Sequence, residues 1–191
     1  MRKPVQNLGA SVRARLLNLA KERNQPFEIL LTRYALERLL YRLGSSKYRE
    51  RFVLKGAMLV RTWVDDPYRP TRDLDLLGFG DSDPDAIIGV FREICTLKAD
   101  DEVVFDIDGL AVDRIRDDAQ YGGLRIKTTA TVDGAKVRVL VDIGFGDAVE
   151  PGSHRDRTVG LAESTRATPS CLSIRDRRCR EIPGNGDAGP R

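Results

Sequence analysis

The residue pair Asp133-Gly134 constrains the fold of this chain more than any other feature, because it separates two long strand-like segments. Aspartate followed by glycine is among the strongest signals for a two-residue hairpin turn, in which both central residues need a positive φ. The flanking segments, 123–132 and 136–145, are rich in the β-branched residues typical of strands. The sequence therefore predicts an antiparallel hairpin near the end of the folded region.

Helix-like and strand-like segments alternate before this hairpin. Ser11 is expected to cap a first amphipathic helix, and Pro26 and Gly44 are expected to begin and close a second one. The further expected elements, in chain order, are a strand at 52–56, a helix at 57–64, a strand at 71–78, a helix at 84–97 and a strand at 103–115 broken near Gly109. This order predicts an α+β fold with a mixed sheet and two N-terminal helices.

Residues 151–191 differ in composition from everything before them. They contain no aromatic residue and no lysine, and arginine, serine, threonine, proline and glycine dominate. Because no periodic apolar stripe remains to be buried, this segment is expected to be largely disordered. The sequence thus predicts one domain over 1–150 followed by a tail over 151–191.

The net charge of +3 hides unlike segments. Residues 1–50 hold 11 basic and 4 acidic residues, a net charge of +7, whereas 51–150 hold 13 and 20, a net charge of −7. A basic surface can face a polyanion such as RNA, and an acidic one can hold divalent cations. The arginines of the second helix, Arg33, Arg38 and Arg42, fit either an RNA contact or an ordinary solvated face.

Cysteine usage and hydropathy point to the cytoplasm. The three cysteines form no CxxC pair and are odd in number, which argues against a disulfide framework. No apolar run reaches the roughly 18–20 residues that span a bilayer, and the N-terminus has no secretory signal. We therefore expect a cytoplasmic protein with no membrane partner.

Three aspartates on two strands suggest a site for a divalent cation. On a strand, Asp73 and Asp75 point to the same face, while the leucines that alternate with them face the core. Asp142 interrupts an otherwise apolar strand, where an unpaired charge would be costly to bury. If the two strands are neighbours, the three carboxylates converge into an oxygen cage suited to Mg²⁺. The alternative is that Asp142 meets water at a strand end or pairs with an arginine.

The turn Lys55-Gly56-Ala57 has the features of a phosphate contact. A glycine lets the backbone approach a phosphate, the following helix offers free N–H groups, and Lys55 adds a positive charge. Combined with the three aspartates, this turn predicts metal-assisted phosphoryl or nucleotidyl transfer. The only histidine, His154, lies in the tail, which argues against Ser-His-Asp and Cys-His catalysis. Lys127 could also reach a nucleotide, although a solvated strand lysine is the simpler interpretation.

Several short motifs match a known pattern: LLTRYALERLLYRL at 30–43, FVLKGA at 52–57, RPTRDLDL at 69–76, YGG at 121–123 and VDIGFGD at 141–147. Together they resemble, over residues 10–150, the AbiEii/AbiGii toxin family of nucleotidyltransferases from abortive-infection type IV toxin–antitoxin systems. The resemblance implies a polymerase-β-like fold, Mg²⁺, a nucleoside triphosphate donor, transfer to the 3′ end of tRNA and a cognate antitoxin encoded nearby.

The resemblance also implies roles for individual residues. Asp73, Asp75 and Asp142 match the catalytic metal ligands. The positions that it relates to nucleotide binding are Lys55, Gly56, Ala57 and Arg72, with Ala57 in place of the usual serine. Thr71 matches a hydroxyl residue that the antitoxin phosphorylates in some relatives, and a dianion beside the metal ligands would block them.

The tail departs from this family. Relatives continue into a helical half with a nucleotide-contacting lysine and a further aspartate, and 151–191 contain neither motif. The chain thus resembles a toxin with a truncated C-terminal half and a divergent tail, such as a frameshift in a GC-rich gene would produce. Two alternatives to an active transferase stay open: a non-catalytic remnant that binds nucleotide or antitoxin, and a metal-dependent nuclease that uses the same carboxylates.

Overall fold

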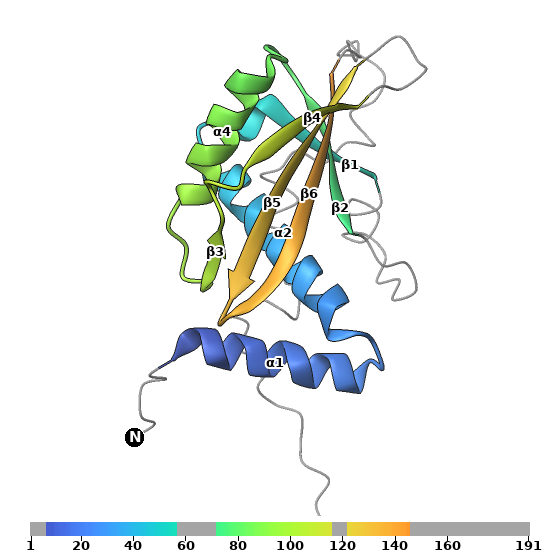
Figure 1. Cartoon of the computed structure of the whole chain (residues 1–191), viewed down its shortest axis with the longest axis vertical. Coiled ribbons are helices and arrows are strands. Elements are labelled where there is room, and N and C mark those ends of the chain that lie inside the picture. Colours follow the sequence, from blue (N-terminus) through green and yellow to red (C-terminus); the bar gives the residue numbers. More distant parts are fainter. Residues whose placement is uncertain (1–6, 57–71, 116–121, 146–191) are drawn as a thin grey trace, which may run out of the picture.

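The structure is a computed structural model that describes residues 7–56, 72–115 and 122–145 (Figure 1). Its helices are α1 (Leu8–Glu22), α2 (Phe27–Ser45), α4 (Pro84–Thr96) and a short 3-10 helix, η1 (Arg49–Arg51). Its strands are β1 (Phe52–Lys55), β2 (Asp73–Gly78), β3 (Val103–Phe105), β4 (Ala111–Ile115), β5 (Gly123–Val132) and β6 (Ala135–Phe145). The predicted helix at 57–64, Ala57, Thr71 and the tail at 151–191 lie outside the described residues.

The strands form one mixed sheet in the order β1-β2-β6-β5-β3. On the edge of β5 that faces away from β6, β3 pairs with residues 130–132 and β4 pairs with residues 123–127. β2 and β6 run parallel, and all other pairs are antiparallel. Helices and a mixed sheet in one unit confirm the predicted α+β class. None of the helices in the described ranges is long and apolar enough to cross a membrane.

The predicted hairpin is confirmed. β5 and β6 are joined through Asp133 and Gly134, whose φ values of 44° and 77° are the positive values that this turn requires. The only difference is that β6 begins at Ala135, which pairs directly with Val132. The two-residue turn thereby fixes which residues lie opposite each other along the whole hairpin.

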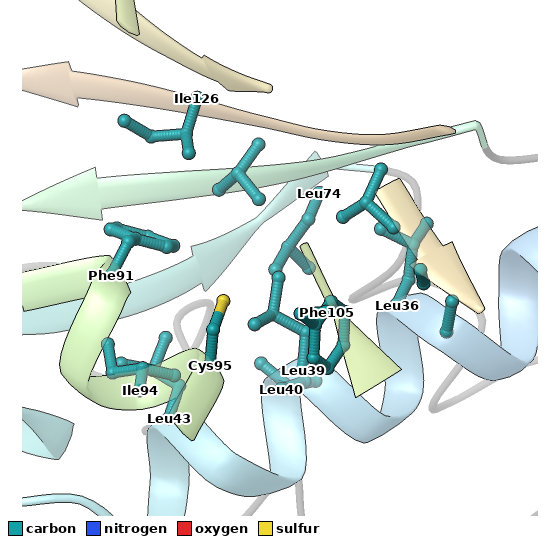
Figure 2. Packing of buried hydrophobic residues seen from close by; sticks show 14 of the residues in the cluster. Leu36, Leu39, Leu40, Leu43, Leu74, Phe91, Ile94, Cys95, Phe105 and Ile126 are labelled. Carbon is teal, nitrogen blue, oxygen red and sulfur yellow. The ribbon is translucent and has the colours of Figure 1, made fainter. Parts of the chain in front are cut away.

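The core lies between the sheet and the helices α2 and α4 (Figure 2). Leucines of α2 and the apolar stripe of α4 meet the inward side chains of the strands, and the rings of Phe52 and Phe91 pack edge to face at 5.8 Å. Along β5 each second residue is buried, as expected for a strand with one face on the core. The opposite face of β5 is only half-buried, and this is the face that carries the charged residues.

The first helix begins earlier than predicted. Asn7, not Ser11, is its N-cap: the Asn7 side chain accepts a hydrogen bond from the Ala10 N–H at 2.9 Å. Ser11 already donates its backbone N–H to the Asn7 carbonyl, so it lies within the first turn. Pro26, expected within the second helix, is instead its N-cap: the helix begins at Phe27 and ends at Ser45, one residue beyond Gly44.

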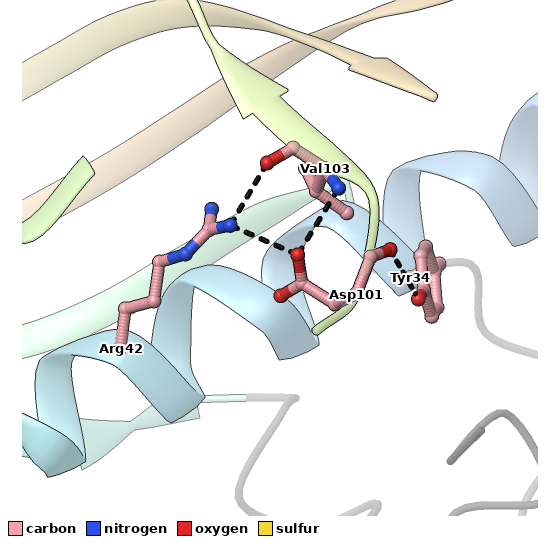
Figure 3. Close-up of polar contacts among 4 residues, drawn as sticks. All are labelled: Tyr34, Arg42, Asp101 and Val103. Carbon is pink, nitrogen blue, oxygen red and sulfur yellow. Dashed lines mark hydrogen bonds and ion pairs between the residues drawn. The ribbon is translucent and has the colours of Figure 1, made fainter. Parts of the chain in front are cut away.

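The arginines of α2 do not share one solvated face, which corrects the prediction. Arg42 is 4% exposed and its guanidinium donates to the Asp101 carboxylate at 2.9 Å and to the Val103 carbonyl at 2.8 Å (Figure 3). Arg33 instead forms an ion pair with Glu37 one turn along the helix. Sequence could not show this, because Asp101 lies far away in the chain and reaches α2 only through the fold.

Tyr34 adds a second contact to the same loop. Its hydroxyl donates a hydrogen bond to the Asp101 carbonyl at 2.9 Å (Figure 3). Burial raises the pKa of the Tyr34 hydroxyl and, by the same cause, raises the pKa of the Asp101 carboxyl. The pair Arg42–Asp101 and the Tyr34 hydroxyl thus attach α2 to the segment that enters β3.

Candidate functional site

The strand β2 presents two carboxylates on the face of the sheet that points away from the core. Leu74 and Leu76 are 0% and 2% exposed and point into the core. Because side chains alternate along a strand, Asp73 and Asp75 point to the opposite face, where both are half-buried. This is the orientation that the sequence predicts.

The strand β6 brings the third carboxylate to the same place. β6 lies beside β2 in parallel, and Asp142 is the direct register partner of Asp75. Its neighbours Val141 and Ile143 are each 1% exposed and point into the core. Because side chains alternate along a strand, Asp142 points away from the core, as Asp73 and Asp75 do. Asp73, Asp75 and Asp142 are hereafter called the carboxylate cluster.

The carboxylate cluster fits a divalent cation. One oxygen from each aspartate lies within 4.8 Å of the other two, and all three side chains are half-buried. Oxygens on one octahedral Mg²⁺ are at most about 4.2 Å apart, twice the metal–oxygen distance of about 2.1 Å. Small side-chain rotations would therefore bring the three oxygens onto one ion, and carboxylates are the ligands that Mg²⁺ and Mn²⁺ prefer.

Arg125 on β5 binds the outer side of the carboxylate cluster. Its Nε donates to Asp142 Oδ1 at 2.7 Å and its Nη2 donates to Asp142 Oδ2 at 2.6 Å, in a two-pronged ion pair. The two residues are direct register partners in the hairpin. The hydrogen bonds from Arg125 to Asp142, with the charge of that carboxylate, raise the pKa of Arg125. Asp142 thus has both predicted surroundings at once, an arginine partner and two neighbouring aspartates.

Sequence reasoning missed the role of Arg125, although a signal for it exists. Arg125 lies seven residues before Val132, and Asp142 lies seven residues after Ala135. A two-residue turn at Asp133-Gly134 makes positions equally distant from the turn face each other. Counting outward from the turn therefore places Arg125 opposite Asp142.

The end of β1 lies against the other side of the carboxylate cluster. Lys55 is exposed and is the register partner of Asp75. Gly56 has a φ of 70°, and a Cβ added there would come within 2.0 Å of Asp75 Oδ2. Only a residue without a side chain lets the backbone lie this close to the Asp75 carboxylate. The predicted phosphate contact and the carboxylate cluster are neighbours.

The remaining predicted residues are placed as follows. Arg72 is exposed and directly precedes Asp73 at the start of β2. Lys127 forms an ion pair with Asp113 of β4, which supports neither a nucleotide contact nor simple solvation. Ala57 and Thr71 lie outside the described residues, so their roles stay predictions.

Comparison with known proteins supplies one family. The family described as "Nucleotidyl transferase AbiEii toxin, Type IV TA system" matches residues 38–176. The match spans more than half of the chain and includes all three residues of the carboxylate cluster, Arg125 and the Lys55-Gly56 turn. It extends 26 residues beyond the predicted domain boundary at residue 150. A comparison with curated proteins gave no match.

Proposed function

Because the chain belongs to the AbiEii nucleotidyl transferase toxin family, we propose that it transfers a nucleotide from a nucleoside triphosphate to RNA at the carboxylate cluster. The observation that carries this proposal is the convergence of Asp73, Asp75 and Asp142 across β2 and β6, with oxygens within 4.8 Å of one another. Family membership supports the reaction class, and the geometry supports the residues.

The carboxylate cluster would hold Mg²⁺ through one oxygen from each aspartate. When bound, the ion supplies positive charge that offsets the triphosphate and makes an attacking hydroxyl easier to deprotonate. Two strands that pair in fixed register position the three ligands, so little reorganisation is needed on binding. Because Gly56 has no Cβ, the Asp75 carboxylate can lie directly against the backbone there.

Exposed cations beside the cluster would bind the triphosphate. Lys55 lies next to Asp75 in register, and Arg72 directly precedes Asp73. Both side chains are exposed, which leaves them accessible to phosphate oxygens. An arginine can bind a phosphate with two hydrogen bonds, whereas a lysine acts as a point charge.

The acceptor, the regulation and the location belong to the same proposal. The resemblance to the toxin family favours tRNA, at its 3′ end, as the acceptor, and a cognate antitoxin as the partner. Phosphorylation of Thr71 would place a dianion two residues from Asp73 and repel both the cation and the triphosphate. These events would take place in the cytoplasm, where both tRNA and nucleoside triphosphates are found.

A label-transfer assay tests the function. The protein is incubated with Mg²⁺, total tRNA and each labelled nucleoside triphosphate, beside the variants Asp73→Asn, Asp75→Asn and Asp142→Asn. Each variant keeps the side-chain shape but loses the charge, so transfer is expected to fall by about 100-fold or more. Asp108→Asn, at an exposed aspartate of the loop before β4, is the matched control and should retain full transfer.

The other outcomes identify the alternatives. Nucleotide binding without transfer by the wild-type chain would contradict the proposal and identify a binding protein. Shortened RNA that requires Mg²⁺ and the three aspartates would contradict it as well and identify a nuclease. Transfer that persists in all three variants would show that the carboxylate cluster is not the site.

A further inference from the structure

Arg125 forms an ion pair with Asp142 at the candidate site, and two hydrogen bonds define its geometry. Its guanidinium bonds both oxygens of Asp142, at 2.7 and 2.6 Å. The pair is only partly exposed, with 40% of the Arg125 side chain and 21% of the Asp142 side chain accessible. Two parallel hydrogen bonds fix the plane of a carboxylate as well as its position.

We propose that Arg125 is a positioning residue that holds both oxygens of Asp142 from the β5 side and competes with divalent cations for them, so that a cation binds tightly only together with a nucleoside triphosphate. This inference rests on the proposed function, because it assigns the cation and the triphosphate to the carboxylate cluster. It adds a residue that neither the sequence prediction nor the family match identifies.

Arg125 occupies only part of the hydrogen-bonding capacity of the Asp142 carboxylate. Each carboxylate oxygen has two lone-pair positions, and Arg125 takes one on each oxygen of Asp142. One position per oxygen stays open to a cation, so Asp142 can serve both. A cation that binds there therefore meets a carboxylate whose electron density is already shared with a guanidinium.

Arg125 also changes the charge at the carboxylate cluster. The carboxylate cluster alone carries a charge of −3 within a few ångströms. The guanidinium of Arg125 offsets one of these charges, which stabilises the three carboxylates against their mutual repulsion while no cation is bound. The same positive charge then opposes a divalent cation, and triphosphate oxygens would restore the missing negative charge and the missing ligands.

Lys127 differs from Arg125 in its ion-pair partner. This residue lies two positions along β5 on the same half-buried face and carries the same charge. Its partner, however, is Asp113 of β4, which is not part of the carboxylate cluster. Lys127 is therefore a matched control that separates a specific effect of Arg125 from a general loss of positive charge on this face.

Binding of Mn²⁺ tests the inference independently of catalysis. Free Mn²⁺ is measured by electron paramagnetic resonance, with and without a non-hydrolysable nucleoside triphosphate, for the wild-type chain and for Arg125→Gln, Arg125→Ala and Lys127→Ala. Without nucleotide, both Arg125 variants should bind Mn²⁺ about tenfold more tightly, the effect of one unit charge about 6 Å from a divalent ion in a water-like dielectric. Lys127→Ala should change the affinity less than about threefold, because its charge is more distant and screened by salt.

Thermal unfolding supplies a second readout. Without metal, the Arg125 variants should unfold at a lower temperature than the wild-type chain, and Mn²⁺ should raise that temperature more in the variants. With nucleotide present, the difference in Mn²⁺ affinity between Arg125→Gln and wild type should shrink. Circular dichroism confirms that each variant is folded before titration, and Arg125→Gln retains a long polar side chain if Arg125→Ala does not fold.

The outcomes separate this inference from the proposed function. Folded Arg125 variants that bind Mn²⁺ no more tightly than wild type overturn the inference, while label transfer by the wild-type chain leaves the proposed function intact. If Asp142→Asn binds Mn²⁺ as well as wild type does in the presence of nucleotide, both are overturned.

Discussion

At the scale of single residues, Gly56 lies so close to Asp75 that any side chain introduced at position 56 would displace the Asp75 carboxylate. The backbone at Gly56 adopts a φ of 70°, a conformation in which a Cβ is strained by itself. A methyl group there would also overlap the Asp75 side chain, whose Oδ2, Cγ and Cβ would lie 2.0, 2.8 and 2.9 Å away. The glycine is thus required both for the turn and for the carboxylate cluster.

Gly56→Ala is therefore expected to displace the Asp75 carboxylate from its position beside Asp73 and Asp142. Label transfer should fall at least about tenfold, which corresponds to about 1.4 kcal/mol of transition-state stabilisation. Gly89→Ala is the control, because Gly89 is an exposed residue of α4 and a Cβ there meets nothing within 4 Å. The control should retain activity and gain about 0.5–1 kcal/mol of stability from the better helix former. Equal activity of the two variants would contradict the role given to Gly56.

At the scale of elements, the buried pair Arg42–Asp101 attaches α2 to the start of β3. Arg42 and Asp101 are 4% and 2% exposed, and Asp101 also accepts the backbone N–H of Val103 at 3.0 Å. Burial lowers the pKa of Arg42, since the charged guanidinium loses hydration. Such a pair is costly to break on one side only, because the remaining charge stays buried.

Asp101→Ala should lower the free energy of unfolding by about 3–5 kcal/mol, as measured by urea denaturation. Replacing both residues together, as Arg42→Met with Asp101→Leu, should cost much less than the single change, because no buried charge is left. The exposed pair Lys47–Glu93 serves as the control, with no measurable loss for Glu93→Ala. A loss for the double variant as large as for Asp101→Ala would show that the ion pair itself stabilises the fold.

The elements also show how far a sequence can predict this fold. The hairpin and the orientation of Asp73 and Asp75 depend on local rules, a two-residue turn and a period of two, and both are confirmed. The parallel pairing of β2 with β6 joins residues 67 positions apart, such as Asp75 and Asp142. The sequence alone does not predict this pairing, so it predicts the three-aspartate site only if the two strands are neighbours. The burial of Arg42 depends on a carboxylate 59 residues away, and no local pattern predicts it.

At the scale of the whole molecule, the structure shows where several of the charged residues of the basic and acidic segments lie. Part of the positive charge in residues 1–50 does not lie on a free surface, because Arg42 is buried and Arg33 pairs with Glu37. Arg13 lies 3.9 Å from Asp133 in the hairpin turn, which neutralises a further part. In the acidic segment, by contrast, three aspartates converge on a single site.

The predicted domain boundary can be tested by truncation. If residues 1–150 form the folded unit, a chain that ends at residue 150 should unfold cooperatively in urea, with a free energy within about 0.5 kcal/mol of the full chain. The full-length chain with the same purification tag is the reference. A much lower stability would contradict the boundary and would show that residues of the matched segment 151–176 pack on the domain.

The carboxylate cluster is proposed to hold one cation between β2 and β6, on Asp73, Asp75 and Asp142. Iron-dependent cleavage tests it most directly: Fe²⁺ replaces Mg²⁺, and with ascorbate it produces radicals that cut the backbone nearest to the bound ion. With a non-hydrolysable nucleoside triphosphate present, we expect cuts near residues 73–75, 142 and 55–56, suppressed by excess Mg²⁺ and lost in Asp75→Asn. Cuts elsewhere, or cuts that neither excess Mg²⁺ nor Asp75→Asn changes, would contradict the claim.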